Sequence, residues 1–208
     1  MQKRFNIYGI ITIVLFLAAC SDYKNSDITP NQFQGTDTER IQQAVNKAAE
    51  RTGRVTIPAL NANGSAVWLI DSAILLPADI SVILNNCTLQ LSDSCRDNMF
   101  RSDNVGPGIT NPARTSNIHI IGLGEVTLKG ADNPRATGDS GKKLSLHPEK
   151  DIEASGDWRI SYGTDAGKEG AKQTGDWRNI LILMAYVDGF KLKNLNIQNA
   201  HAWAVSHE

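Results

Sequence analysis

Short segments in which every second residue is apolar recur along most of this chain, and their spacing constrains the fold more than any other feature. Alternation with a period of two predicts strands with one packed face and one solvated face. A step of 22 residues, from Ile180 to Ala202, holds such strands and two corners bearing Asn or Gly before the next strand starts. Short strands repeated at a spacing in the twenties are typical of a solenoid. The expected strands are residues 55–58, 67–70, 80–84, 88–91, 118–121, 126–128, 180–184, 190–192, 195–197 and 203–205.

Asparagine occupies the expected corners, because this residue tolerates the left-handed backbone that a tight corner needs. A β-sandwich would have strands of similar length, but its hairpins usually contain tight Asn-Gly or Asp-Gly turns. In this chain only Asn63-Gly64 and Asp188-Gly189 have that form. The sequence therefore predicts an all-β parallel β-helix. The corner asparagines are Asn85, Asn86, Asn194 and Asn199.

One amphipathic helix is predicted ahead of the first strand. Thr36 and Glu39 have the spacing of a capping box, and Gly53 suits the left-handed residue that follows a helix. Between them, apolar residues at helical spacing form one face. We expect this helix, about 14 residues long, to cover the first turn of the solenoid. Its apolar residues are Ile41, Ala44, Val45, Ala48 and Ala49.

The first 19 residues have the pattern of a signal peptide. Lys3-Arg4 precedes an apolar run over residues 10–19, which is shorter than the roughly 20 residues that span a bilayer. Leu17-Ala18-Ala19-Cys20 resembles the lipobox of bacterial lipoproteins, which implies that Cys20 carries the lipid; the alternative is a plain secretory signal. We expect a polar tether over residues 20–35 and a lipid-anchored protein of the bacterial cell envelope, facing either the periplasm or the exterior.

An exported chain folds in an oxidising compartment, where cysteines pair readily. Cys87 and Cys95 could form a disulfide that closes a small loop, or remain as two half-buried thiols. Their spacing does not decide between these alternatives.

Two stretches near the start, GTDTERIQQA at residues 35–44 and GRVTIP at residues 53–58, are followed by Leu76-Pro77. They resemble the opening of the pectate-lyase-like right-handed β-helix superfamily, particularly its glycoside hydrolase family 28 (polygalacturonase-like) branch, in which a helix caps the first rung. NIHIIGLGEVTLKG at residues 117–130 is similar to the recurrent rung of that superfamily. The resemblance implies a right-handed parallel β-helix over residues 36–208, with the predicted helix as its N-terminal cap.

The catalytic elements of that branch, Asn-Thr-Asp, Asp-Asp, Gly-His and Arg-Ile-Lys, do not occur in this chain. No catalytic residue is therefore assigned. Solenoids need a cap at both ends, and the last predicted strand is followed by none. We expect the chain to be the N-terminal part of a longer enzyme, truncated before the rungs whose aspartates would hydrolyse a pectin-like polysaccharide with inversion.

The rung pattern is interrupted from Lys129 to Arg178, and an insertion of this length is uncommon unless it is functional or disordered. The insertion repeats the sequence Gly-Asp-Trp-Arg. Tryptophan stacks on sugar rings and arginine pairs with uronate carboxylates, so these residues are candidate substrate contacts. The alternative is that they pack the insertion onto the solenoid. The candidates are Trp158, Arg159, Trp177 and Arg178.

The last predicted strand places His201, Trp203 and His207 at alternate positions, so they are expected to share one face that contacts sugar. The alternative is a buried Trp203 with histidines hydrogen-bonded to loops.

Carboxylates suited to glycoside hydrolysis must be held several ångströms apart. Asp93, Asp97 and Asp103 cluster after one strand, but nothing in the sequence holds two of them at a defined separation. The same cluster is a weak Ca²⁺ candidate, so neither a metal site nor a cofactor is expected. The net charge of -1 excludes an electrostatically driven nucleic-acid binder.

The sequence thus favours a lipid-anchored, carbohydrate-active β-helix protein with a polysaccharide substrate. Two alternatives stay open: a surface lipoprotein that binds glycan without turnover, and a polysaccharide lyase of the same fold. The fold does not decide among them.

Overall fold

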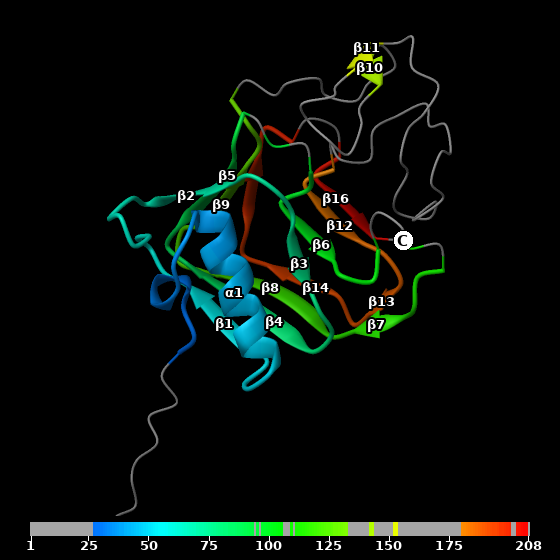
Figure 1. Cartoon of the computed structure of the whole chain (residues 1–208), viewed down its shortest axis with the longest axis horizontal. Helices are drawn as coiled ribbons and strands as arrows, with labels where there is room; N and C mark the ends of the chain where they lie inside the picture. The colour runs from blue at the N-terminus through cyan, green and yellow to red at the C-terminus, as the bar shows by residue number, and fades with distance from the viewer. Residues whose placement is uncertain are drawn as a thin grey trace, which may run out of the picture.

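The computed structural model describes residues 27–93, 95, 97–105, 109, 111–132, 180–200 and 203–207, and the backbone of residues 142–143 and 152–153. In this part of the chain, three parallel sheets of four strands each surround a common core (Figure 1). The chain passes from one sheet to the next in turn, and each strand pairs with the strand at the same place one coil later. The fold is a right-handed parallel β-helix, which confirms the predicted architecture.

Each of the three sheets contains one strand from each of four stacked coils. Sheet A contains β1 (Arg54–Ile57), β4 (Ile80–Asn85), β8 (Ile118–Leu123) and β14 (Lys191–Lys193). Sheet B contains β2 (Val67–Ile70), β5 (Thr88–Leu91), β9 (Thr127–Lys129) and β15 (Asn196–Gln198). Sheet C contains β3 (Ile74–Leu76), β6 (Phe100–Ser102), β12 (Ile182–Met184) and β16 (Val205–His207). Two short pairs accompany them: β7 (Thr115–Ser116) with β13 (Val187–Asp188), and the antiparallel β10 (Lys142–Lys143) with β11 (Ile152–Glu153).

The sequence predicts neither β3 nor β6, although the expected strands at 180–184 and 203–205 overlap β12 and β16 of the same sheet. Both strands have only three residues, too few to display alternation. β3 is a continuous apolar run, and β6 has an arginine at its centre. The prediction therefore lacks the third side of the first two coils.

The predicted helix is α1 (Asp37–Ala49), and its capping box is present. The Glu39 backbone N–H donates to Thr36 Oγ1 over 3.2 Å, and the Thr36 N–H donates to the Glu39 carboxylate over 2.8 Å. The predicted apolar face is buried except for Ala49, which is exposed. Gly53 follows the helix with a φ of 64°.

α1 covers the N-terminal end of the β-helix by satisfying the open edges of the first coil, which would otherwise be unpaired backbone. Gln42 accepts from the Leu75 N–H over 2.7 Å and donates to the Leu75 carbonyl over 3.1 Å, which closes the edge of β3. The Leu69 N–H donates to Asp37 Oδ2 over 3.0 Å, which closes the edge of β2. Ile28, just before the short 3₁₀ turn η1 (Pro30–Gln32), forms a bridge with Val55 of β1.

The corner before sheet A is left-handed in successive coils. Gly53, Asp79, Asn117 and Gly189 have φ values of 64°, 57°, 55° and 76°. Asn117 Nδ2 donates to Asp79 Oδ1 over 2.7 Å, so this corner is also bonded from coil to coil. The corner after sheet A is similar, with Asn86, Gly124 and Asn194 at φ values of 49°, 70° and 53°. The predicted role of Asn86, Asn194 and Asn199 is confirmed, whereas Asn85 is the last residue of β4.

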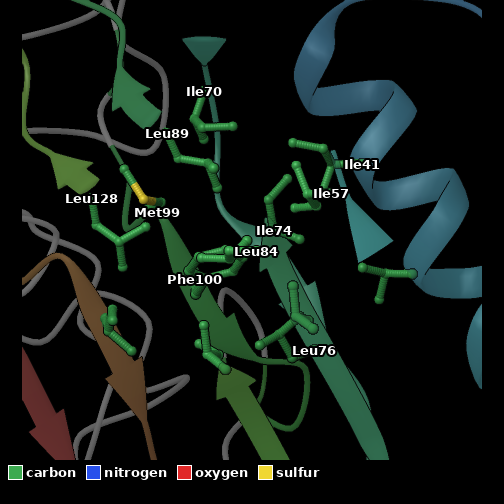
Figure 2. Packing of buried hydrophobic residues seen from close by; sticks show 14 of the residues in the cluster. Ile41, Ile57, Ile70, Ile74, Leu76, Leu84, Leu89, Met99, Phe100 and Leu128 are labelled. Carbon is green, nitrogen blue, oxygen red and sulfur yellow. The ribbon is translucent and has the colours of Figure 1, made fainter. Parts of the chain in front are cut away.

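The core consists of rows of side chains stacked in register. Trp68, Leu89 and Leu128 form one row of sheet B and are fully buried. Figure 2 shows Met99 between Leu89 and Leu128, and Ile41 of α1 beside Ile57. The rows end in the last coil with Leu192, Ile197 and Val205, which are only half-buried.

Gly122→Ala should destabilise the fold strongly. A Cβ at Gly122 would lie 2.0 Å from the Asn194 carbonyl oxygen, which belongs to the corner of the next coil and can move only with the backbone. We expect a loss of roughly 2–3 kcal/mol in the free energy of unfolding, measured by chemical denaturation. Gly64→Ala is the control, because a Cβ there has nothing within 4 Å and costs only its left-handed φ, about 1 kcal/mol. Equal losses in the two variants would contradict the packing assigned to Gly122.

Candidate functional site

The two longest connections in the sequence of this β-helix lead into or out of sheet C. Residues 103–117 lead out of β6 and residues 130–181 lead into β12, while the shorter segment 92–99 leads into β6. By contrast, residues 86–87 and 124–126 suffice to pass from sheet A to sheet B in the second and third coils, although residues 58–66 make this connection in the first. Binding and catalytic residues are concentrated on loops that a rigid scaffold positions. The outer face of sheet C is therefore the candidate site.

The middle of the outer face of sheet C is covered, unlike that of an ordinary solvated sheet. Leu75, Arg101, Leu183 and Ser206 lie in register across the four coils. Arg101 is 5% exposed and Leu183 is fully buried, whereas Leu75 and Ser206 at the two ends of the row are half-buried. The outward-facing Leu69 of sheet B, by comparison, is 44% exposed. The cover therefore lies over the two central coils, and the two ends of this face are more open.

Arg101 is the centre of a buried polar cluster on this face. Its Nη1 lies 2.5 Å from Asp97 Oδ1 and 3.4 Å from Asn98 Oδ1. Asp97 Oδ1 also accepts the Asn98 backbone N–H over 2.9 Å. Fully buried Asn98 donates through Nδ2 to the Ile180 carbonyl over 2.6 Å. A buried charge persists only where it is paired and hydrogen-bonded, and this cluster meets both conditions while joining segments 82 residues apart.

The aspartates that the sequence groups together are separated by β6. Asp97 precedes the strand and is paired with Arg101, whereas Asp103 follows the strand. Burial raises the pKa of the Asp103 carboxyl above its ordinary value. Next to it, Asn104 Nδ2 donates to the carbonyls of Ala113 and Ala185 over 2.6 and 2.9 Å, which holds the loop after β6 against the end of β12. A raised pKa is a requirement for a general acid, but the structure does not bring Asp103 and Asp97 together as a pair.

Sequence reasoning missed Arg101 and Asn98. The one local sign of these residues is the sequence Met99-Phe100-Arg101-Ser102, in which a charged residue at the centre of a short strand follows two apolar residues. The partners of Asn98 come from a distant part of the sequence and leave no local signal.

The last strand differs from its prediction. β16 begins at Val205, so Trp203 precedes the strand. The Trp203 carbonyl accepts the Leu181 N–H over 3.1 Å, and Trp203 is 69% exposed. His207 is in register with Met184, a core residue, yet it is exposed in this last coil, and its Nε2 lies 2.9 Å from the Val187 carbonyl. Its ring centroid lies 5.6 Å from that of Phe190. The expected shared His-Trp-His face stays a prediction, whereas the alternative of a buried Trp203 is wrong.

Several predicted residues lie outside the described part of the chain. They include the signal segment over residues 1–19, Cys20 and, among the candidate sugar contacts, Trp158, Arg159, Trp177, Arg178 and His201. The base of the predicted insertion is described. Lys129 Nζ lies 2.7 Å from Asp132 Oδ1 and Gln90 donates to Asp132 Oδ2 over 2.8 Å, which lowers the pKa of Asp132.

Two further kinds of site were searched for in the described residues. No group of three or more His, Cys, Asp and Glu residues there is placed to hold a metal ion. None of the helices in the same part of the chain has the length and apolar character needed to cross a bilayer.

Cys87 and Cys95 are not joined by a disulfide. Cys87 lies in the core, 3% exposed, and burial raises the pKa of its thiol to about 11. Cys95 is half-buried, and its Sγ lies 3.6 Å from the Asp97 carbonyl.

The two thiols should differ in reactivity. At pH 8 a pKa of about 11 leaves Cys87 almost entirely protonated, and the thiolate is the form that reacts. Iodoacetamide treatment of the folded chain, followed by peptide mapping, should modify Cys95 well before Cys87. In denaturant the two rates should become similar. Equal labelling of both cysteines in the folded chain would contradict the buried position of Cys87.

Comparison with known proteins gives one structural similarity. No protein-family model and no curated protein sequence matches the chain. Among solved structures, the chain is similar to PfbA, a surface adhesin of Streptococcus pneumoniae, with 12% sequence identity and a TM-score of 0.47. The match covers 83% of this chain and 33% of PfbA, so this chain spans about a third of the length of that protein.

Proposed function

We propose that this chain is part of a carbohydrate-active β-helix protein of the bacterial cell envelope, anchored through Cys20, and that its glycan site is the outer face of sheet C. The observation that carries the proposal is that three connections, over residues 92–99, 103–117 and 130–181, lead into or out of that sheet. The resemblance of residues 35–44 and 53–58 to the opening of the polygalacturonase-like branch supports a pectin-like polysaccharide as the ligand.

Trp203 is the described residue best suited to contact sugar. Its side chain is exposed at the entrance to β16, and its backbone is fixed to Leu181 in the coil before. An indole presents a large flat apolar face, which matches the C–H face of a sugar ring. Trp203 precedes β16 and Arg101 lies in β6, so the two residues belong to coils two strands apart in sheet C, where adjacent strands lie about 4.8 Å apart.

The Arg101 cluster supports the site from beneath. Arg101 and Asn98 are buried, so they hold the loop before β6 in place and do not form the outer surface. The exposed residues of that loop and of the loop after β6 are then presented from a rigid base. Rigid support of this kind reduces the loss of conformational entropy that accompanies binding.

The reaction proposed for the whole protein is glycosidic hydrolysis, in which one carboxylic acid protonates the leaving oxygen and another carboxylate activates water. Binding without turnover is the second candidate. It is favoured by the commitment of Asp97 to Arg101, which occupies that carboxylate with a structural ion pair. No described carboxylate is assigned a catalytic role.

Binding and turnover can be measured separately with the full chain and polygalacturonate. Reducing ends without new ultraviolet absorbance would indicate hydrolysis, and absorbing unsaturated products would indicate a lyase. Binding with neither product would support the second candidate. No binding to polygalacturonate, or to a panel of neutral polysaccharides, would contradict a glycan site.

Trp203→Ala should weaken polysaccharide binding about 2- to 10-fold, because an aromatic stacking contact contributes roughly 0.5–1.5 kcal/mol. Titration calorimetry of the wild type and the variant measures the difference. Trp203→Phe should retain most of the affinity. Leu123→Ala is the matched control, since Leu123 is also exposed, at 45%, but ends a strand of sheet A. Unchanged affinity in Trp203→Ala would remove Trp203 from the site.

A further inference from the structure

Three exposed aliphatic residues lie together at the N-terminal end of the β-helix. Leu60, Val67 and Leu69 are 52%, 37% and 44% exposed. Leu123 and Trp203 are the only other large hydrophobic residues that the described part of the chain exposes, and both lie in later coils. Leu60, Val67 and Leu69 are called the first-coil patch below.

The patch is held by a hydrogen-bonded centre at Asn61, which is 6% exposed. The Asn61 N–H donates to the Ser65 carbonyl over 2.8 Å and closes the loop between β1 and β2. Its Nδ2 donates to Asp37 Oδ2 over 3.0 Å and to the Val67 carbonyl over 3.3 Å. The same Asp37 oxygen accepts the Leu69 N–H. The patch therefore has a fixed geometry, tied to the start of α1.

The segment that carries the patch has no charged side chain, and the one carboxylate bonded to it, that of Asp37, accepts hydrogen bonds from Asn61 and Leu69. No charged residue occurs between Arg54 and Asp71, although charged residues make up 21% of the whole chain. Residues 62–66, which form the loop beside the patch, are all exposed. This loop projects at the left of the view in Figure 1, on the same side as η1. Moving an uncharged aliphatic surface out of water carries no penalty in free energy for desolvating charge, whereas moving a charged surface out of water does.

The N-terminal segment enters the fold beside this patch. Asn31 Nδ2 donates to the Leu60 carbonyl over 3.0 Å, and Gln32 Nε2 donates to the Asp27 carbonyl over 3.1 Å. Only six residues separate Cys20 from Asp27. At a maximum of about 3.3–3.6 Å per residue, that segment spans no more than about 25 Å. A lipid on Cys20 would therefore keep the bilayer within this distance of Asp27.

We propose that the first-coil patch rests on the surface of the bilayer in which Cys20 is anchored, with Leu60, Val67 and Leu69 in contact with lipid. The proposal rests on the lipid anchor of the proposed function. Aliphatic side chains without aromatic or polar partners suit the boundary between headgroups and acyl chains better than they suit a sugar. Three such residues are too few to anchor the protein alone, so the patch orients the solenoid, with α1 toward the membrane and the later coils away from it.

Spin labels on the full lipidated chain in vesicles of phosphatidylethanolamine and phosphatidylglycerol test this contact. A nitroxide is attached to Leu69→Cys or Leu60→Cys in a Cys95→Ser background, since Cys87 is buried. Leu123→Cys is the matched control, because Leu123 and Leu69 are almost equally exposed, at 45% and 44%. Collision with oxygen and with a water-soluble nickel complex measures whether each label contacts lipid or water.

The labels at positions 60 and 69 should gain oxygen collisions and lose nickel collisions several-fold when the chain binds vesicles, while the label at position 123 stays in water. Equal water exposure at all three positions on bound vesicles would contradict the contact between the first-coil patch and lipid, but not the lipid anchor on Cys20. Spin–spin broadening at position 69, with water-like collisions, would assign the patch to a second copy and also overturn the proposal. Failure of the unlabelled chain to float with vesicles, with no difference from Cys20→Ala, would overturn the anchor and the patch together.

Discussion

Every coil of this β-helix depends on a left-handed corner before sheet A, which changes the direction of the chain within one or two residues. The pairing of strands in all three sheets depends on these corners recurring in register. Asp79 and Asn117 adopt φ values of 57° and 55° at the same place in successive coils, and the Asn117 amide donates to the Asp79 carboxylate. A shift of one residue at such a corner would move every following core side chain to the outer face. The approach of the Asn194 corner to Gly122 shows how little room this stacking leaves.

The first coil shows how the open edge of a solenoid can be satisfied without another coil. A helix cannot continue a β-ladder with its own backbone, because its N–H and C=O groups are already paired along its axis. α1 uses side chains instead: Gln42 supplies a donor and an acceptor to Leu75, and Asp37 accepts from Leu69. The polar face of α1 thus replaces a strand, while Ile41 and its neighbours supply the apolar side of the same contact.

Local patterns in the sequence predict those parts of the fold whose cause is local. Thr36 and Glu39 locate the start of α1, and alternating apolar residues locate the longer strands, because each signal lies within a few residues of the structure it produces. β3 and β6 escape prediction because three residues are too few to show a period. The burial of Arg101 cannot be predicted from its neighbours, since Asn98 reaches the Ile180 carbonyl across 82 residues of sequence. The sequence also singles out Trp203 as a candidate sugar contact, which stays a prediction, and it does not predict that this residue precedes β16.

The connections of this β-helix differ in how much length they can gain. The corners between sheets A and B must keep their geometry, whereas the connections to sheet C can vary. Between sheets A and B the corners of the second, third and fourth coils touch, so added residues there would break the stacking. The ladder of sheet C stays in register although the connections that lead to its strands differ greatly in length, and the Arg101 cluster ties the described residues before β6 to Ile180 before β12. A ligand site can therefore develop beside sheet C at little cost to the fold. If the first-coil patch lies against a bilayer, the solenoid axis points outward and this face extends away from the membrane, where a long polysaccharide could reach it along several coils.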